Sequence, residues 1–223
     1  MREIVLDTET TGLDPAAGHR VVEIGCVELS NHVPTGRTFH VYCNPEMAMP
    51  EEAFRIHGHS DAFLADKPKF AEIAADFVAF VDGAKLVIHN AAFDIGFLNA
   101  ELKRLGLTPF SLAHAVDTVG MARSRFPGAP ANLDALCRRF GIDNSARTKH
   151  GALLDAELLA EVYLELVGGR QPGLGLVRAA IAAAALAPAE RPRREPRPHA
   201  PTEAELAAHQ AFLAEIASPI WNQ

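Results

Sequence analysis

The chain has 223 residues, of which 48% are apolar and 22% are charged, a composition that supports a buried core and excludes disorder over most of its length. No apolar run reaches the roughly 18 residues of a membrane span, and the first residues have the pattern of a strand rather than of an export signal. The three cysteines lack the spacing of a zinc site or a disulfide framework. We therefore expect a cytoplasmic protein without membrane contact. Residues 1–168 contain 15 basic and 23 acidic side chains, which argues against strong non-specific binding of nucleic acid by this part of the chain alone.

In chain order, apolar periodicity and turn residues predict three strands, a helix, a strand, a helix, a short strand and two helices, over residues 2–7, 21–29, 37–43, 68–81, 85–89, 94–105, 115–116, 133–140 and 151–167. The second and third strands follow each other closely enough to predict an antiparallel meander. Strands followed by strand–helix alternation predict an α/β fold, with a mixed sheet flanked by helices.

The composition changes after residue 168. Residues 188–201 contain five prolines and four arginines, which is typical of a flexible linker. A capping box at Thr202 and Glu205 then begins a short amphipathic helix. Such a helix cannot bury its apolar face alone, so we expect it to dock onto its own domain or onto a partner. We therefore divide the chain into a folded domain at 1–168, a flexible linker at 169–200 and a docking segment at 201–223.

Four acidic side chains stand at positions that a hydrophobic core would not choose. Asp7 and Glu9 follow the apolar first strand and point to the same face, because side chains alternate along a strand. Asp94 and Asp155 each lie on the inward apolar stripe of a predicted helix. No arginine or lysine lies on these stripes, so we expect no such side chain among the carboxylates and infer that a bound cation keeps them ionised.

Oxygen ligands of this kind suit hard divalent cations such as Mg²⁺ or Mn²⁺, and a pair of such ions stabilises the attacking and leaving oxygens at a phosphorus centre. His150, five residues before Asp155, is placed to deprotonate the attacking water. Each residue alone has a simpler explanation: a solvated strand end, a helix N-cap, a first-turn acid or a loop histidine. The metal site is favoured because these separate explanations would all have to be true at once, for side chains that lie on apolar faces.

Three stretches resemble the motifs of the DEDD-type 3′→5′ exonucleases: DTETTG at 7–12, NAAFD at 90–94 and HGALLD at 150–155. The third has the spacing of the histidine branch, and residues 2–168 are most similar to the proofreading subunits of bacterial replicative DNA polymerases. The resemblance implies a ribonuclease-H-like fold and removal of mismatched nucleotides, as 5′-monophosphates, from a single-stranded 3′ end of DNA. It also implies a general base, His150, and two divalent metal ions held by Asp7, Glu9, Asp94 and Asp155.

The same resemblance assigns the pocket for the terminal nucleotide to Thr8, Thr10, His57 and Phe93. For Thr10, shaping the turn after the first strand is an alternative role. For Phe93, packing in the core is equally consistent with the sequence.

In proofreading subunits of this type a flexible extension binds the polymerase catalytic subunit. Here the resemblance implies that the extension binds through four anchors, Leu213, Ile216, Ile220 and Trp221. Gln171, Leu174 and Leu176 resemble the short motif that binds the sliding clamp, although a linker that starts after a helix C-cap explains them equally well.

Two other functions stay open at this point. A free-standing exoribonuclease of the same fold would trim RNA, but it would leave residues 169–223 without a purpose. A non-catalytic adaptor between polymerase and clamp would not need the acidic and histidine side chains of the three motifs.

Overall fold

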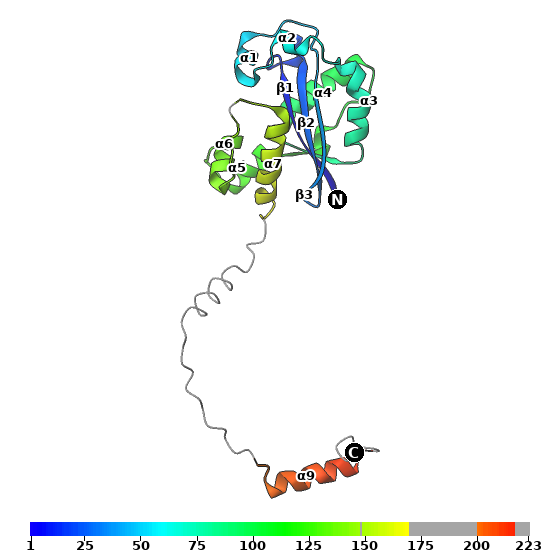
Figure 1. The fold of residues 1–223 in the computed structure, drawn as a ribbon, viewed down its shortest axis with the longest axis vertical. Coiled ribbons are helices and arrows are strands. Elements are labelled where there is room, and N and C mark those ends of the chain that lie inside the picture. The colour runs from blue at the N-terminus through cyan, green and yellow to red at the C-terminus, as the bar shows by residue number, and fades with distance from the viewer. Residues whose placement is uncertain (148, 170–199, 217–223) are drawn as a thin grey trace. The chain divides into compact units, whose positions relative to one another are not determined.

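The chain divides into two units, Met1–Gly173 and Leu174–Gln223, and a five-stranded sheet is the centre of the larger one (Figure 1). The structure is a computed structural model, and it describes residues 1–147, 149–169 and 200–216. The strands are β1 (Arg2–Thr10), β2 (Val21–Ser30), β3 (Val33–Tyr42), β4 (Lys85–Ile88) and β5 (Ala115–Asp117). Their order is β3-β2-β1-β4-β5, with an antiparallel β1–β2–β3 meander and parallel pairing of β4 with β1 and of β5 with β4. The mixed sheet confirms the predicted fold class.

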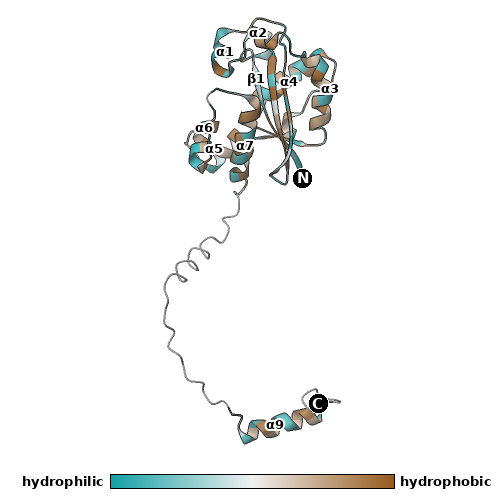
Figure 2. Cartoon of the chain, in the orientation of Figure 1, coloured by the Kyte–Doolittle hydropathy of each residue, from teal (hydrophilic) through white to brown (hydrophobic). Residues whose placement is uncertain are grey.

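Helices cover both faces of the sheet (Figure 1). In this unit they are α1 (Glu51–His57), α2 (Asp61–Leu64), α3 (Phe70–Val81), α4 (Ala91–Arg104), α5 (Thr118–Arg125), α6 (Leu133–Phe140) and α7 (Ala152–Leu166), with 3-10 turns η1 (Pro15–Ala17) and η2 (Leu112–His114). α3 and α4 pack on the face that holds Ile4 and Leu6, whereas α5, α6 and α7 pack on the face that holds Val5. Because side chains alternate along a strand, Asp7 and Glu9 share the face of Val5. Apolar residues gather in the sheet and in the helices that cover it (Figure 2).

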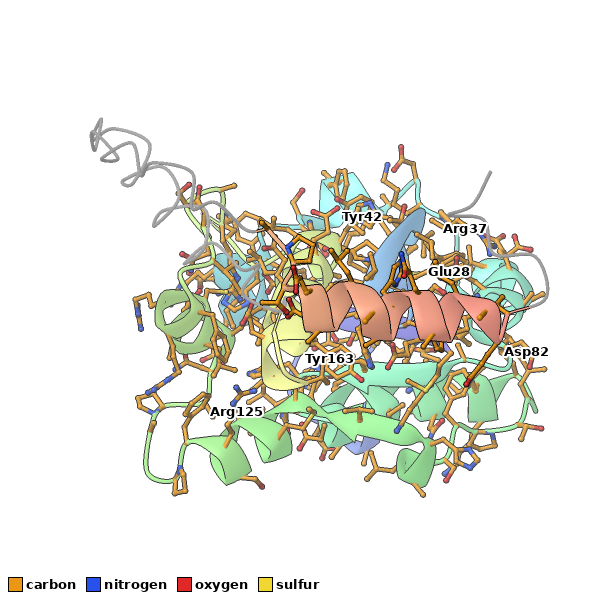
Figure 3. The ribbon with its side chains drawn as sticks, turned by 90° about the horizontal axis from the view of Figure 1, so that it is seen from below. Glu28, Arg37, Tyr42, Asp82, Arg125 and Tyr163 are labelled. Carbon is orange, nitrogen blue, oxygen red and sulfur yellow. The ribbon has the colours of Figure 1, made fainter. Side chains whose placement is uncertain are left out.

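Polar contacts close the sheet at the end where β1 begins, away from the carboxylates. Glu28 accepts a hydrogen bond from Arg2 at 2.6 Å. It accepts another at 3.0 Å from Arg37, which Figure 3 labels together with Glu28. The Tyr163 hydroxyl of α7 donates to the buried carboxylate of Glu3 at 2.7 Å. These contacts tie α7 and the outer strands to β1, so the opposite end of β1 is supported by a rigid frame.

Most predicted elements agree with the structure, and the differences concern ends and short helices. β1 continues to Thr10 and therefore includes Glu9, and β3 begins at Val33 rather than at 37. The sequence does not predict α1, α2 and α5. With seven and four residues, α1 and α2 are too short for helical periodicity to be recognised, and α5 buries only Thr118 and Ala122, so it has no apolar stripe.

In the second unit the structure describes residues 200–216, which contain α9 (Glu203–Ala214). The predicted capping box forms, since the Thr202 hydroxyl accepts from the Glu205 amide at 3.3 Å and the Glu205 carboxylate accepts from the Thr202 amide at 2.8 Å. Towards the end of the described segment, the apolar side chains of Phe212 and Ile216 are exposed, while Leu213 is half-buried. Gln171, Leu174, Leu176, Ile220, Trp221 and nearly all of the predicted linker lie outside the described residues. Among the helices that are described, none has the length and apolarity that crossing a bilayer demands.

Candidate active site

The end of β1 carries the first two of the predicted metal ligands. Asp7 pairs with Gly25 of β2 and Glu9 pairs with Glu23, so both acids stand on the paired part of β1, just before its register shifts between Glu9 and Thr10. Glu9 is only 8% exposed. Two neighbouring carboxylates are therefore held at a fixed spacing on the face of the sheet that α7 covers.

The first turn of α4 places the third carboxylate beside them. The chain leaves β4, turns at Asn90 with a left-handed φ of 70° and begins α4 at Ala91. Asp94 is buried, and its Oδ1 accepts hydrogen bonds from the amide and the hydroxyl of Thr8 at 3.0 and 2.8 Å. Thr8 thus orients Asp94, a contact that the sequence alone does not indicate.

A glycine on β2 lets the fourth carboxylate approach. Asp155 is buried in the first turn of α7. That turn crosses β2 at Gly25, where an added Cβ would overlap the backbone of Ala152 and Leu153. Because Gly25 is paired with Asp7, its missing side chain brings the start of α7 next to Asp7. The sequence analysis missed this residue, although a glycine inside an apolar strand is a known signal for close backbone approach.

Glu23, a buried acid on β2, lies close enough to the start of α7 to feel its first amide. Its carboxylate accepts hydrogen bonds from ring nitrogens of His40 and His59, each at 2.7 Å, and the nearby Ala152 amide also favours its ionised form. Burial alone would raise the pKa of Glu23, but these hydrogen bonds outweigh burial and lower it. A negative charge at a helix N-terminus stabilises the unpaired amides there. Glu23 is a second residue that the sequence analysis missed, and its only signal is an acid within an apolar strand.

His150 stands just before α7, at the edge of the acidic cluster. One ligand atom each from Glu9, His150 and Asp155 lies within 4.8 Å of the other two. His150 Nδ1 is 3.4 Å from Asp155 Oδ2, and the His150 side chain is 48% exposed. The imidazole is therefore next to the carboxylates and open to solvent, as a general base would need to be.

The expectation that no arginine stands among the carboxylates is wrong. Arg147 donates Nε and Nη2 to the two oxygens of Asp155 at 2.5 and 2.6 Å. Its Nη2 is also 2.8 Å from His150 Nδ1, and its Nη1 is 2.9 Å from Asp134 Oδ1. The apolar stripes of the helices could not reveal this contact, because Arg147 reaches the cluster from the polar loop between α6 and α7.

The four carboxylates have different electrostatic environments. Burial, joined by the neighbouring acids, raises the pKa of Asp7 well above its usual value and that of Glu9 to about 8. Burial also raises the pKa of Asp94 to about 7. Burial opposes ionisation of Asp155 as well, but Arg147 and His150 outweigh it and lower the pKa of Asp155. One guanidinium does not balance four carboxylates, so this all-oxygen donor set fits divalent cations.

Two adjoining cavities open beside the cluster. A cavity of about 290 Å³ is lined by the four carboxylates together with His150 and Arg147. A cavity of about 400 Å³ is lined by Glu9 and by all four residues assigned to the nucleotide pocket, Thr8, Thr10, His57 and Phe93. The Thr10 hydroxyl also donates to the Gly12 carbonyl at 2.7 Å, so the alternative role of Thr10 in shaping the turn is present too.

His57 brings a neutral imidazole to the larger of these two cavities. Its side chain is nearly buried, and its Nδ1 accepts from the His59 amide at 3.0 Å. Its buried Nε2 has no hydrogen-bond partner within the described ranges. Burial, aided by His59, lowers the pKa of His57 to about 4. The backbone of Thr10 also acts on the ring and opposes this lowering of the pKa.

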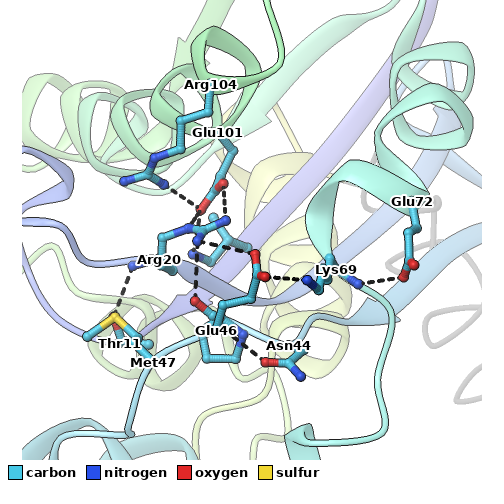
Figure 4. Close-up of polar contacts among 11 residues, drawn as sticks. Thr11, Arg20, Asn44, Glu46, Met47, Lys69, Glu72, Glu101 and Arg104 are labelled. Atoms are coloured by element: carbon cyan, nitrogen blue, oxygen red, sulfur yellow. Dashed lines mark hydrogen bonds and ion pairs between the residues drawn. The ribbon is translucent and has the colours of Figure 1, made fainter.

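A network of ion pairs anchors the segment between β1 and β2 that forms a wall of the same cavity (Figure 4). Arg20 donates to the buried Glu101 of α4 through Nε at 2.6 Å and Nη2 at 2.9 Å. The Arg20 amide donates to the Thr11 hydroxyl at 2.9 Å, and Glu46 joins Arg20 to Lys69. The wall that contains Thr10 and Gly12 is thus fixed to α4, the helix that carries Asp94.

Comparison with known proteins adds an independent result. The profile of the Exonuclease family (RNase_T) matches residues 4–163. The chain belongs to this exonuclease family. The DNA polymerase III subunit epsilon of Rickettsia felis is 54% identical to this exonuclease over 222 residues, 97% of each chain. The DNA polymerase III subunit epsilon of Escherichia coli K12 is 52% identical over 176 residues, 76% of this chain and 72% of the relative.

Solved structures share the fold of this exonuclease. The nuclease domain of 3′hExo, a DEDDh family member bound to rAMP, superposes with a TM-score of 0.63 at 19% identity, over 74% of this chain and 91% of that domain. Exonuclease X, in complex with 5′ overhanging duplex DNA, superposes with a TM-score of 0.56 at 24% identity, over 74% of this chain and 90% of that chain. The resemblance to DEDD-type exonucleases is confirmed, and this exonuclease is a proofreading nuclease of the epsilon type.

Proposed function

We propose that this exonuclease hydrolyses the last phosphodiester bond at a single-stranded 3′ end of DNA, using two divalent cations, and releases nucleoside 5′-monophosphates. The main support is the meeting of four carboxylates from β1, α4 and α7 beside His150 on one cavity. Elements far apart in the sequence have no structural reason to gather like charges at one point, whereas binding of metal ions by oxygen ligands requires it.

Asp7, Glu9, Asp94 and Asp155 would hold the ions, with Mg²⁺ or Mn²⁺ as the candidates. When bound, such ions activate water and stabilise negative charge on both the attacking and the leaving oxygen. Thr8 keeps one oxygen of Asp94 in a fixed direction through two hydrogen bonds. The acids on β1 are held by strand pairing, so little reorganisation is needed to present them.

His150 would take the proton of the attacking water. Its ring is exposed at the mouth of the smaller cavity and lies 3.4 Å from Asp155 Oδ2, which would stabilise the imidazolium that forms. In the larger cavity His57 would offer Nε2–H to the terminal nucleotide, and Phe93 would contribute an apolar wall. The two cavities share Thr8, Glu9 and Phe93, so a nucleotide in one would place its phosphate near the carboxylates in the other.

Selection of mismatched ends would follow from the need for a single strand. Unpairing a terminal base pair costs a few kcal/mol when it is matched and less when it is mismatched. The acidic unit of residues 1–168 binds DNA weakly by itself, so attachment to a partner would supply the local concentration of DNA ends.

The C-terminal segment would provide that attachment in the cytoplasm. Apolar side chains on and next to α9, with the half-buried Leu213 and the exposed Ile216 among the anchors, would bind the polymerase catalytic subunit. Ile220 and Trp221 would extend the same surface, and Gln171, Leu174 and Leu176 would bind the sliding clamp.

The test replaces Asp7 in the full-length chain. Asp7→Asn keeps the shape of the side chain and removes one ligand charge, so we expect hydrolysis of a mismatched primer in Mg²⁺ to fall by about 1,000-fold or more. Addition of EDTA should abolish the activity of the unaltered protein. Quantitative gel assays of primers with matched and mismatched 3′ ends would measure both effects and the preference for mismatches.

The matched control is Asp76→Asn on the exposed face of α3, which should leave the rate unchanged. Circular dichroism would check that both variants fold. Unchanged nuclease activity of Asp7→Asn, or full activity in EDTA, would refute the metal-dependent mechanism. Faster hydrolysis of an RNA end than of a DNA end would favour the exoribonuclease instead.

A further inference from the structure

Arg147 forms a two-pronged contact with one of the candidate metal ligands. Nε and Nη2 contact different oxygens of Asp155, at 2.5 and 2.6 Å, in the side-by-side geometry that makes guanidinium–carboxylate pairs strong. Both side chains are nearly buried, with exposures of 9% for Arg147 and 4% for Asp155. The ion pair is therefore a substantial interaction, unlike an exposed salt bridge.

The same guanidinium engages the candidate base. Nη2 lies 2.8 Å from His150 Nδ1, and a guanidinium can only donate, so Nδ1 must accept. A ring nitrogen that accepts from Arg147 is not free to accept a proton from water. In this arrangement Arg147 occupies both oxygens of a metal ligand and one nitrogen of the base.

A second carboxylate holds the other side of the guanidinium. Nη1 donates to Asp134 Oδ1 of α6 at 2.9 Å, and Asn144 donates to the same oxygen at 2.9 Å. Asp134 is 44% exposed and is not among the candidate metal ligands. Arg147 thus has a partner that it can keep while it gives up Asp155.

We propose that Arg147 is an exchangeable partner of Asp155, which withdraws when a divalent cation binds and remains attached to Asp134. A cation bound to an Asp155 oxygen and a guanidinium on the same carboxylate would repel each other at close range. Withdrawal frees Asp155 as a ligand and His150 Nδ1 as a base in a single movement. Arg147 would therefore couple metal loading to activation of the base, an inference that rests on the proposed metal site.

The first test measures metal binding without turnover. Isothermal titration of the full-length chain with MnCl₂ should give Arg147→Gln a dissociation constant about 3- to 10-fold lower than that of the unaltered protein, because a competing cation is gone. Arg138→Gln is the matched control, since this arginine is exposed in the last turn of α6 and makes no ion pair with any described residue. Arg138→Gln should change the constant much less than Arg147→Gln.

Asp134 provides a test of the attachment. In Asp134→Asn the guanidinium has only Asp155 as a charged partner, so Mn²⁺ should bind more weakly than to the unaltered protein. The same substitution should have little further effect in a chain that already carries Arg147→Gln, because Asp134 acts through Arg147. An equally large effect of Asp134→Asn in both backgrounds would contradict the proposed attachment.

A spectroscopic readout covers the case in which Arg147→Gln fails to fold. In ¹⁵N-labelled unaltered protein, the Nε–Hε signal of Arg147 should shift as Mg²⁺ is added and should saturate together with the Asp155 amide signal. An unmoved Nε–Hε signal at saturating Mg²⁺, or Mn²⁺ binding to Arg147→Gln no tighter than to Arg138→Gln, would overturn the exchange. If the unaltered protein binds no Mn²⁺ at all, the proposed metal site itself fails.

Discussion

At the residue scale, His57 makes the clearest prediction about pH. Its pKa in the folded protein is lowered to about 4 by burial and by His59, whereas an unfolded histidine titrates near its usual value of about 6.5. Between these two values the unfolded chain binds a proton and the folded protein does not, so the stability linked to His57 is lost as pH falls from about 6.5 to 4.

We therefore expect His57→Gln to lose less stability than the unaltered protein between pH 7 and pH 5, by about 1–2 kcal/mol in the free energy of unfolding. Urea titrations at the two pH values measure this difference. His114→Gln, which changes an exposed histidine on η2, should follow the unaltered protein. Equal pH slopes for His57→Gln and the unaltered protein would contradict the burial argument.

The same scale shows which site residues a sequence can reveal. Asp94 and Asp155 were predictable because each sits on an apolar helical stripe, where a carboxylate is costly without a partner. Arg147 and Asp134 were not, because their meeting depends on the path of the loop between α6 and α7. Thr8 was expected in the nucleotide pocket, but its hydrogen bonds to Asp94 depend on how α4 meets β1.

At the element scale, the position of α7 depends on the absence of a side chain on β2. Gly25→Ala would press a methyl group against the backbone of Ala152 and Leu153, which must move away. We expect a loss of about 1–3 kcal/mol in stability. Because Asp155 follows in the same turn, we also expect nuclease activity to fall. Thermal melting and hydrolysis of a short single-stranded primer measure the two effects.

The matched control for this substitution is Gly96→Ala in α4, where an added Cβ meets nothing within 4 Å. Since alanine favours a helix over glycine by up to about 1 kcal/mol, this variant should be as stable as the unaltered protein or slightly more stable. Full activity and an unchanged melting temperature for Gly25→Ala would show that the start of α7 is not held at Gly25.

Elements with a long or capped pattern were predictable, whereas those defined by tertiary contact were not. α6 begins at Leu133 and ends at Phe140 as expected, because Asn132 caps its first turn and Gly141 ends it. β1 extends beyond its apolar run to Thr10, since pairing with β2 continues through the polar residues Asp7 and Glu9. Strand pairing of this kind leaves no local signal, so the sequence understates how rigidly the two acids are held.

At the scale of the whole chain, the nuclease unit and the segment around α9 separate into two units with a boundary after Gly173. The first unit closes on itself before that boundary. Arg125 donates to the carbonyls of Glu165 and Leu166 at 2.7 and 2.8 Å. The Gly169 amide donates to the Leu164 carbonyl at 2.9 Å. The C-terminal carbonyls of α7 are therefore satisfied within residues 1–173.

Because the C-terminal end of α7 is satisfied in this way, we expect a chain of residues 1–173 to fold. It should degrade a short single-stranded primer in Mg²⁺ within about twofold of the full-length rate, because no residue that lines either cavity lies beyond Leu159. The same chain should no longer co-purify with the polymerase catalytic subunit. Attachment of the exonuclease raises its effective concentration at the primer end, so polymerase-dependent removal of a mismatch should fall by about 100-fold or more.

A double substitution in the full-length chain, Leu213→Asp with Ile216→Asp, separates loss of the anchors from loss of the whole segment. It should abolish co-purification and leave hydrolysis of the free primer unchanged, because a charge in an apolar interface carries a desolvation cost that the free nuclease unit never meets. Capture of the polymerase subunit by residues 1–173 as strong as by the full-length chain would instead place the partner surface on the nuclease unit, and α9 would then need another role.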